Sequence, residues 1–200
     1  VLANDYNDNK FWENIPKDTL KLVSCLNKNE KSTNIFPIPQ YDPFFINHLL
    51  GERSNKWQDK INKIIWRGQT GSKVRKDLIK KLKELPKLQD YLDILDAPIK
   101  NKNWMNKTSQ MQYKYILAID GTGWPGNISW ILSSGSVPII ASRWYVWFMP
   151  LLIPWEDYVP ITITELNGNF IFSDLEQNLH RILNDTELGN KIQKNAYNKY

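Results

Sequence analysis

Two glycine-containing turns hold the residues of this chain that could bind a phosphorylated ligand. The first runs from Trp66 to Ser72 with the sequence WRGQTGS, and Arg75 follows it in what would be the first turn of a helix. The second runs from Asp120 to Asn127 with the sequence DGTGWPGN. Glycine lets the backbone approach a ligand, a helix N-terminus offers unpaired N–H groups, and arginine can hold a phosphate with two hydrogen bonds.

The first turn matches no established phosphate-binding motif. It departs from both G-x-x-x-x-G-K-[ST] and G-x-G-x-x-G. Taken alone, the first turn is explained equally well as an ordinary corner between a strand and a helix. The second turn, taken alone, is explained equally well as a tight turn around a packed Trp124. Two such turns on neighbouring strands, one of them basic, favour a nucleotide-type ligand, with Trp124 stacking on a base or a sugar ring.

Other chemistries have little support in the sequence. His48 and His180 are far apart, and the single Cys25 has no histidine near it in sequence, so neither a metal site nor an activated thiol is indicated. The acidic residues Asp90 and Asp96, with Asp93 between them, recur every three positions, which favours a solvated helix face over an acid–base site. We therefore expect no metal ion and no cofactor.

The hydrophobic pattern predicts the elements that must position the two turns. Strands are expected at Lys63–Trp66, Tyr115–Asp120, Val137–Ala141 and Asp157–Ile163. Helices are expected at Val74–Leu85, at Ile128–Ser134, after a capping box formed by Ser173 and Glu176, and at Thr186–Tyr200. Strands that alternate with helices are typical of an α/β protein with a mostly parallel, doubly wound sheet.

The charge of the chain is concentrated in its middle third. The 200 residues carry a net charge of +5, yet residues 54–114 alone hold 15 Lys and Arg against 6 Asp and Glu, a net +9. Such a basic block indicates an anionic partner such as phosphate, nucleotide or nucleic acid. A solvated, lysine-rich helix is the alternative explanation for most of these lysines.

The remaining segments give weaker indications. Residues 1–53 are rich in Asn, Pro and aromatic residues without periodicity, so we expect a linker or an incomplete domain that begins inside a longer chain. The apolar run from Trp144 to Trp155 is too short to span a bilayer, which needs about 20 apolar residues. It predicts a buried helix and a turn, with peripheral membrane contact as the alternative. One cysteine favours a reducing, cytoplasmic location, and a secreted domain without disulfides is the alternative.

Three strings of the chain, taken in order, resemble glycosyltransferase family 90. They are IIWRGQTGSKVRKDLI, KYILAIDGTGWPGNISWILSSGSVPII and FMPLLIPWEDYVPITITEL, and the similarity extends over Lys63 to Tyr200. The family includes protein O-glucosyltransferases of the Rumi type, fungal capsule-associated proteins and lipopolysaccharide core-modifying enzymes. The resemblance implies a GT-B fold of two Rossmann-like halves. It also implies metal-independent, inverting transfer from a UDP-sugar to a glycan, lipid-linked or protein acceptor, with no nucleic acid as partner.

The resemblance also carries site residues onto this chain. The W-R-G and S-x-x-R motifs, the D-G turn and the residues between and after them would bind the donor. These residues are Trp66, Arg67, Gly68, Gln69, Thr70, Gly71, Ser72, Arg75, Asp120, Gly121, Thr122, Gly123, Trp124, Asn127 and Ser129. The S-G-S motif falls on residues 134–136, and in P-W-x-x-Y-x-P the aromatic residues Trp155 and Tyr158 would shape the wall of the pocket.

Two departures from the family pattern affect the expected activity. Asn127 stands where many members carry an arginine, so the charge of a diphosphate must be balanced by Arg67, Arg75 or a helix N-terminus. No aspartate falls in register with the catalytic base of animal members, and Glu30 is the nearest carboxylate. We expect residues 1–55 to be a reduced, acceptor-side segment with a linker, and residues 56–200 to bind the nucleotide sugar. The alternatives are a non-catalytic module with the same fold and a basic nucleic-acid-binding domain.

Overall fold

The computed structural model of the chain describes residues 2–3, 21–23, 25–27, 35–37, 56–98 and 101–199. Its strands are β1 (Leu2–Ala3), β2 (Lys21–Val23), β3 (Leu26–Asn27), β4 (Ile35–Pro37), β5 (Ile61–Gly68), β6 (Leu92–Asp96), β7 (Tyr113–Ile119), β8 (Val137–Ala141), β9 (Trp144–Tyr145), β10 (Val159–Ile161), β11 (Thr164–Leu166) and β12 (Asn169–Ile171). Its α-helices are α3 (Lys73–Lys83), α4 (Lys107–Gln110), α5 (Ile128–Leu132), α6 (Leu175–Asn184) and α7 (Thr186–Lys199), and its short 3₁₀ helices are η1 (Trp57–Asp59), η2 (Pro86–Tyr91) and η3 (Met149–Leu151).

A five-stranded parallel sheet forms the centre of the fold, in the order β10–β8–β7–β5–β6. Every neighbouring pair in it runs parallel, and β7 and β8 pair from Tyr115 opposite Val137 to Ile119 opposite Ala141. Counted along the chain from the β6 side, the order is 2-1-3-4-5, so the winding reverses between β5 and β7. The predicted doubly wound parallel sheet is confirmed.

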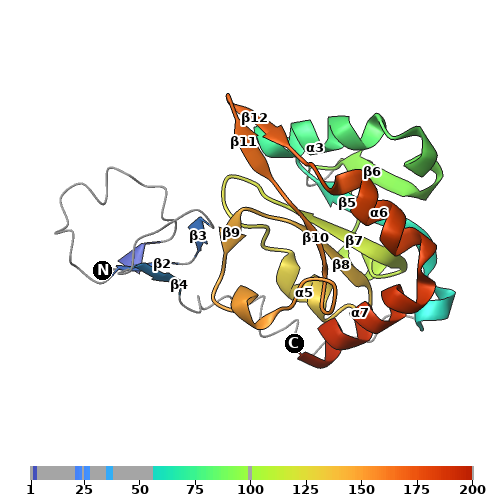
Figure 1. The fold of residues 1–200 in the computed structure, drawn as a ribbon. Coiled ribbons are helices and arrows are strands. Elements are labelled where there is room, and N and C mark those ends of the chain that lie inside the picture. The colour runs from blue at the N-terminus through green and yellow to red at the C-terminus, as the bar shows by residue number, and fades with distance from the viewer. Residues whose placement is uncertain are drawn as a thin grey trace.

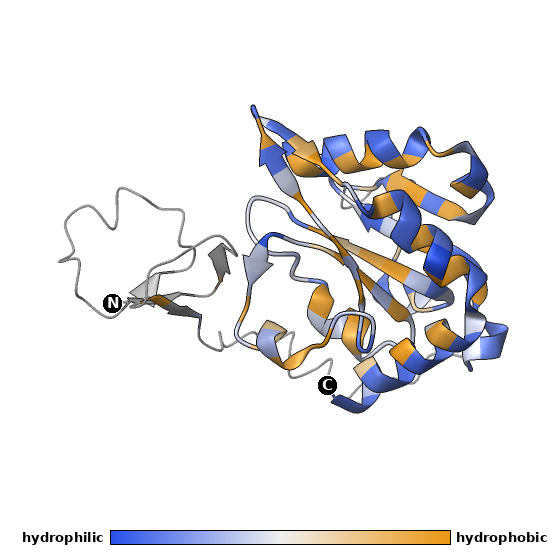
Figure 2. Cartoon of the chain, viewed as in Figure 1, coloured by the Kyte–Doolittle hydropathy of each residue, from blue (hydrophilic) through white to orange (hydrophobic). Residues whose placement is uncertain are grey.

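Apolar side chains cover both faces of this sheet. Successive residues of a strand point to opposite faces, so each buried strand supplies two apolar surfaces. The face that contains Ile64 and Leu117 packs against α3 and α6. The face that contains Ile65 and Ile116 packs against α5 and the segment 144–158. Figure 2 shows hydrophobic residues along the central strands and hydrophilic residues on the outward sides of the helices, so helices cover both faces as predicted.

Most of the predicted elements around the sheet are confirmed. The strand expected at Val137–Ala141 has those bounds as β8, and the strand expected at Tyr115–Asp120 corresponds to β7. The helices expected at Val74–Leu85 and Thr186–Tyr200 correspond to α3 and α7. The periodicity of apolar residues was a sufficient signal for these elements, because each helix or strand buries one face or both faces in the core.

The prediction that Asp90, Asp93 and Asp96 share a solvated helix face was wrong. Asp90 lies in η2, whereas Asp93 and Asp96 lie in β6, which pairs in parallel with β5 at the edge of the sheet. Leu92 and Ile94, on either side of Asp93, pack against the core from partly buried positions. The alternation has the period of a half-buried edge strand, so the carboxylates lie beside β5 and not along a helix.

The segment from Trp144 to Trp155 also differs from its prediction. It contains the short strand β9 and the single turn η3, and no α-helix, because Pro150 and Pro154 supply no backbone N–H for one. Its buried side chains Phe148 and Met149 pack onto the second face of the sheet. None of the helices in the described ranges is both long and apolar enough to cross a lipid bilayer.

Helix α6 begins differently from its prediction. Its N-cap is Asp174 and makes no side-chain capping hydrogen bond, so the capping box of Ser173 and Glu176 does not form. The Asp174 carboxylate instead accepts hydrogen bonds from the N–H and the hydroxyl of Thr162, at 2.9 and 2.6 Å. The predicted apolar face of α6 is confirmed, since its leucines and Ile182 are buried in the core.

A β-hairpin that the sequence analysis did not predict follows the last strand of the sheet. Strands β11 and β12 pair antiparallel across Asn167 and Gly168, whose φ angles of 50° and 72° suit a tight two-residue turn. In Figure 1 the hairpin rises beside α3, and the N–H of Phe170 donates to Oδ2 of Asp77 on that helix at 3.2 Å. The Asn-Gly pair, with the β-branched Thr164 before it and Ile171 after it, was the sequence signal for this hairpin.

The described residues before position 56 form short strands. Strands β1, β2 and β4 make a parallel three-stranded sheet. Strand β3 pairs antiparallel with β9, with Leu26 opposite Tyr145, and the adjacent Cys25 is fully buried in the same hydrophobic cluster as Trp144. Residues 25–27 therefore attach to the larger unit, and the predicted division between residues 55 and 56 stays a prediction.

Candidate functional site

The reversal point of the sheet places the two glycine-containing turns side by side. Strand β5 leads through residues 69–72 into α3, while β7 leads through residues 120–127 into α5. Because β5 and β7 are neighbours, their carboxyl ends meet at one edge of the sheet, and the position between them, called the crevice below, is where open α/β sheets bind ligands. The predicted adjacency of the two turns is confirmed.

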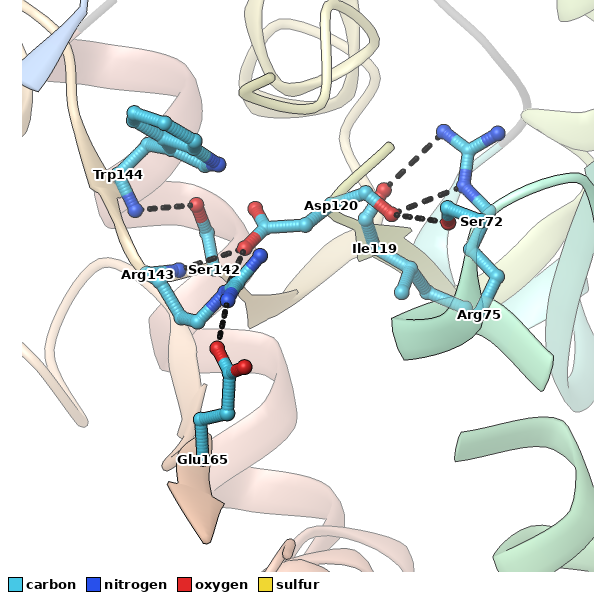
Figure 3. Close-up of polar contacts among 8 residues, drawn as sticks. All are labelled: Ser72, Arg75, Ile119, Asp120, Ser142, Arg143, Trp144 and Glu165. Atoms are coloured by element: carbon cyan, nitrogen blue, oxygen red, sulfur yellow. Dashed lines mark hydrogen bonds and ion pairs between the residues drawn. The ribbon is translucent and has the colours of Figure 1, made fainter. Parts of the chain in front are cut away.

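Arg75, in the first turn of α3, joins the two turns through backbone carbonyls. Its Nη1 donates to the carbonyl of Gln69 at 3.0 Å, its Nε to that of Asp120 at 3.0 Å, and its Nη2 to that of Ile119 at 3.3 Å (Figure 3). Among the described residues no carboxylate forms an ion pair with it. Burial lowers the pKa of Arg75, and the charge of Asp120 opposes this effect. The guanidinium is thus held in place with its charge available to an anion.

Two glycines are required by the side chains around this crevice. A Cβ atom at Gly121 would lie 3.2 Å from Nη2 of Arg75, closer than an ordinary van der Waals contact. A Cβ atom at Gly68 would lie 2.7 Å from the ring of Trp66. The glycines of the D-G and W-R-G motifs are therefore explained by the approach of Arg75 and Trp66.

Arg67 points away from the crevice opening into a buried polar cluster. Its side chain is only 6% exposed, and its Nη2 pairs with Oδ1 of Asp93 at 2.7 Å. The other carboxylate oxygen of Asp93 accepts a hydrogen bond from the hydroxyl of Tyr113 at 2.6 Å. Burial, with the hydrogen bond to Asp93, raises the pKa of Tyr113 to about 12. Trp66 is also buried, so the structure places these two motif residues beneath the turn and not at its surface.

The rest of the first turn is positioned by strand β6 and by the start of α3. The N–H of Thr70 donates to Oδ1 of Asp96 at 2.8 Å, while Gln69 and Gly71 are exposed. Ser72 is the N-cap of α3, yet its side chain makes no capping hydrogen bond, and the first turn of the helix contains no acidic residue. The side chains of Ser72 and of the first turn of α3 therefore neither cap nor neutralise the first N–H groups of the helix.

The second turn has a spacing that the sequence analysis missed. Gly121, Gly123 and Gly126 fit G-x-G-x-x-G between a strand and a helix, the arrangement in which a backbone approaches a diphosphate. The N–H of Gly121 donates to the carbonyl of Gly123 at 3.0 Å, which tightens the turn. The acidic residue that usually follows the next strand of this motif is absent, since Arg143 stands just after β8.

The other predicted residues of the second turn have mainly structural contacts. The ring of Trp124 packs edge-on against Phe148 at 6.3 Å between centroids, on the second face of the sheet. Asn127 is the N-cap of α5 without a side-chain capping bond, and Ser129 is buried with its hydroxyl 3.4 Å from the carbonyl of Gly126. Thr122 is exposed at the tip of the turn.

Asp120 links the second turn to strand β8. Its side chain is fully buried, and Oδ2 accepts hydrogen bonds from the backbone N–H of Arg143 at 2.8 Å and from its Nε at 3.4 Å. Burial raises the pKa of Asp120, while hydrogen bonds from Ser142 and Arg143 oppose the rise. The carbonyl of the same residue receives Arg75 and the hydroxyl of Ser72, so Asp120 fixes both sides of the crevice (Figure 3).

Arg143 is a site residue that the sequence analysis did not single out. Besides Asp120 it contacts the hairpin, with its Nη1 3.0 Å from Oε2 of Glu165 and its guanidinium 4.5 Å from the ring centre of Phe170. Its position two residues after the predicted strand Val137–Ala141 was the available signal, because the carboxyl end of that strand meets the second turn.

The structure does not bring Trp155 and Tyr158 to the two turns. Both precede β10, and Tyr158 is buried in the second hydrophobic cluster. Trp155 has a left-handed φ of 66°, and the guanidinium of Arg181 lies 3.9 Å from its ring centre. They lie toward the amino-terminal edge of the parallel sheet, opposite the carboxyl edge that carries the turns, so a role in the wall of this crevice has no geometric support.

The S-G-S motif also lies at the amino-terminal edge. Ser136 immediately precedes β8, and its hydroxyl receives a hydrogen bond from the ammonium group of Lys60 at 2.8 Å. The carbonyl of Ser134 accepts from the same ammonium at 3.1 Å. The motif therefore anchors a buried lysine at the start of β5.

A separate groove of about 560 Å³ runs between α3, β12 and the start of α6. Its rim carries charges of both signs, from Lys80 and Lys81 on α3 to Glu176 on α6, and Phe170 and Phe172 lie along it. No residue of the two glycine-containing turns lines this groove, so it is distinct from the crevice at the reversal point.

Two predictions about catalysis stay untested. Glu30, the candidate base, lies outside the described residues. In the part of the chain that the structure describes, no three His, Cys, Asp or Glu side chains are grouped so that they could hold a metal ion. Independence from metal remains a prediction of the family resemblance.

The chain matches a protein-family model over most of its length. The model of the family "Glycosyl transferase family 90" matches residues 38–198, more than half of the chain. No curated protein matches significantly. Among solved structures, the chain is similar to the C-terminal domain of a glycosyl transferase group 1 family protein (LpcC) from Francisella tularensis. The identity is 13%, the TM-score is 0.47, and the similarity covers 74% of this chain and 91% of that one.

Proposed function

The chain belongs to glycosyl transferase family 90, and we propose that it binds a UDP-sugar in the crevice between β5 and β7 and transfers the sugar to a hydroxyl acceptor. The position of Arg75 is the observation that carries this proposal. Its guanidinium bridges the two turns through three carbonyls at 3.0–3.3 Å and has no acidic ion-pair partner among the described residues. A diphosphate placed there would supply the missing negative charge.

The start of α3 supports the same assignment. This helix has 11 residues, its N-cap side chain leaves the first N–H groups without a capping bond, and its first turn carries Lys73 and Arg75 with no acid. Helix N-termini carry a partial positive charge and bind anions through such N–H groups. We therefore assign the diphosphate to the region where this helix start, Arg75 and the second turn meet.

The proposed reaction uses this positive charge on the leaving group. The acceptor oxygen attacks the anomeric carbon from the face opposite UDP, a carboxylate takes the proton of the acceptor, and the bond from the sugar to the diphosphate breaks. Attack from the opposite face inverts the anomeric centre, and Arg75 and the helix start stabilise the charge that develops on the departing UDP in place of a metal ion. Glu30 stays our candidate for the base.

Calorimetric titration with UDP tests the donor site. We expect the native chain to bind UDP and Arg75→Met to bind it at least about tenfold more weakly, because a hydrogen bond to a charged group contributes about 1.5–3 kcal/mol. Arg181→Met is the matched control, since Arg181 stacks on Trp155 on another part of the molecule. Absence of UDP binding by the native chain, or equal binding by Arg75→Met, would contradict the proposal. UDP binding without UDP release in the presence of donor and acceptor would favour a non-catalytic module.

A further inference from the structure

The hairpin of β11 and β12 forms a wall beside the crevice and is attached to it on two sides. On the α3 side, the ammonium of Lys73 donates to the side-chain oxygen of Asn169 at 3.2 Å, and the N–H of Phe170 donates to Asp77 at 3.2 Å. On the β8 side, Arg143 pairs with Glu165 at 3.0 Å. The hairpin therefore extends from the end of β10 across to α3, along the carboxyl edge of the sheet.

Glu165 combines an exposed carboxylate with a fixed position. Its side chain is 53% exposed, whereas that of its partner Arg143 is 19% exposed. Arg143 is held from two further directions, by the buried carboxylate of Asp120 (Figure 3) and by the ring of Phe170. An ordinary surface ion pair joins two mobile side chains, but here one partner is immobilised, so the carboxylate is oriented relative to the second turn.

We infer that Glu165 recognises the sugar of the donor by accepting hydrogen bonds from its hydroxyl groups, and that Arg143 is the positioning residue that orients it. This inference rests on the proposed function, because it requires the diphosphate to lie at Arg75. The sugar then projects from the diphosphate along the rim of the crevice, and Glu165 stands on that rim on the far side of Asp120 from Arg75 (Figure 3). The hydroxyl groups of the transferred sugar are donors that a carboxylate binds strongly, and UDP, whose only sugar is its ribose, lacks them.

The charge of Glu165 also predicts which sugars are accepted. A neutral hexose or pentose offers hydroxyl donors to the carboxylate, whereas the carboxylate of a uronic acid at the same place would meet a like charge. UDP-glucose and UDP-xylose are therefore expected to bind better than UDP-glucuronate. Glu165→Gln removes the repulsion and is expected to narrow this preference.

The test compares dissociation constants for UDP, UDP-glucose and UDP-xylose, measured by calorimetry on the full chain. In Glu165→Gln we expect the affinity for UDP to stay within about twofold of native. The UDP-sugar that the native chain binds better should bind at least about tenfold more weakly, because the variant loses a hydrogen bond to a charged group. Glu187→Gln, at an exposed glutamate at the start of α7, is the matched control and should leave the ratio of the two constants unchanged.

Variants of Arg143 test its positioning role. Arg143→Met should raise the dissociation constant for the UDP-sugar relative to that for UDP, as Glu165→Gln does. Arg143→Lys should bring this ratio part of the way back to the native value. A loss of stability alone would not change the ratio in this way. An unchanged ratio for both sugars in Glu165→Gln, with UDP still bound through Arg75, would overturn this inference and leave the donor site intact. Failure of the native chain to bind UDP would overturn the proposed function and this inference with it.

Discussion

Two arginines that flank the same turn have different roles because their partners differ. Arg67 meets the carboxylate of Asp93 in a buried cluster, so its charge is neutralised inside the protein. Arg75 donates its hydrogen bonds to carbonyl oxygens and has no acidic ion-pair partner among the described residues, so its charge can serve the anion that we propose. Both residues fall on family motifs, and the motifs alone do not distinguish a structural arginine from one that can contact the donor.

Replacement of Arg67 tests the structural role of its ion pair. Arg67→Met should lower the free energy of unfolding by about 2 kcal/mol, because it leaves Asp93, whose side chain is 24% exposed, without its cation. The affinity of the folded variant for UDP should stay within a fewfold of native. Urea unfolding and UDP titration measure the two effects, and a stable variant that has lost UDP binding would assign Arg67 to the ligand instead.

Lys60 predicts a pH dependence of stability. Its buried ammonium donates to the carbonyls of Met111 and Ser134 and to the hydroxyl of Ser136, and burial lowers its pKa from 10.5 to about 7. As the pH rises from 7 to 9 the folded chain loses this proton while the unfolded chain still holds it. Stability should therefore rise with pH over this range, by about 1 kcal/mol per pH unit.

Urea unfolding at pH 7, 8 and 9 measures this slope. Lys60→Met, which keeps the stem and removes the titrating group, should give a flatter profile over the same range. A native profile as flat as that of the variant would show that the three acceptors keep the ammonium charged well above pH 7.

At the scale of the elements, the second turn is shaped by its contact with α3. Gly121→Ala places a methyl group 3.2 Å from Nη2 of Arg75 and should displace the guanidinium from the carbonyl of Ile119. We expect severalfold weaker UDP binding and a smaller change in melting temperature. Arg181→Met is again the control, because Arg181 stacks on Trp155 on another part of the molecule. Equal UDP affinity in the two variants would separate this glycine from the ligand site.

The hairpin depends on its two-residue turn. Gly168 has a φ of 72°, a conformation that costs other residues roughly 1–2 kcal/mol, so Gly168→Ala should lower the free energy of unfolding by about 1 kcal/mol. Gly71→Ala, at a position with open space and without a left-handed φ, should be nearly neutral. Denaturant unfolding of both variants measures the difference, and a neutral Gly168→Ala would mean that the hairpin relaxes its turn at little cost.

At the scale of the whole molecule, strand order decides which turns form the site. The sheet winds outward from β5 to β6 in one direction and from β7 to β10 in the other, so the reversal point, where open α/β sheets bind ligands, lies between β5 and β7. Covering helices on both faces leave this carboxyl edge as the place where backbone N–H groups and carbonyls remain open to a ligand. The motifs at residues 134–136 and 154–160 lie at the opposite edge, where they anchor the core.

The sequence by itself determined the class of fold and the two turns. Apolar residues repeat at the strand and helix periods over 61–68, 73–83, 113–119 and 137–141, and such local patterns specify element type because each element buries its own apolar side. The ordered motifs determined the family. Local sequence also contained the Asn-Gly turn of the hairpin and the alternation in β6, although neither was interpreted as a strand signal.

Only the tertiary structure decided which side chains meet. Asp93 lies beside Arg67 because β6 pairs with β5, and Arg143 meets both Asp120 and Glu165 because β8 ends between the second turn and the hairpin. These partners are 22 to 26 positions apart in the chain. Their pairing depends on the order of the strands and on the path of the hairpin, which local periodicity and turn chemistry do not specify.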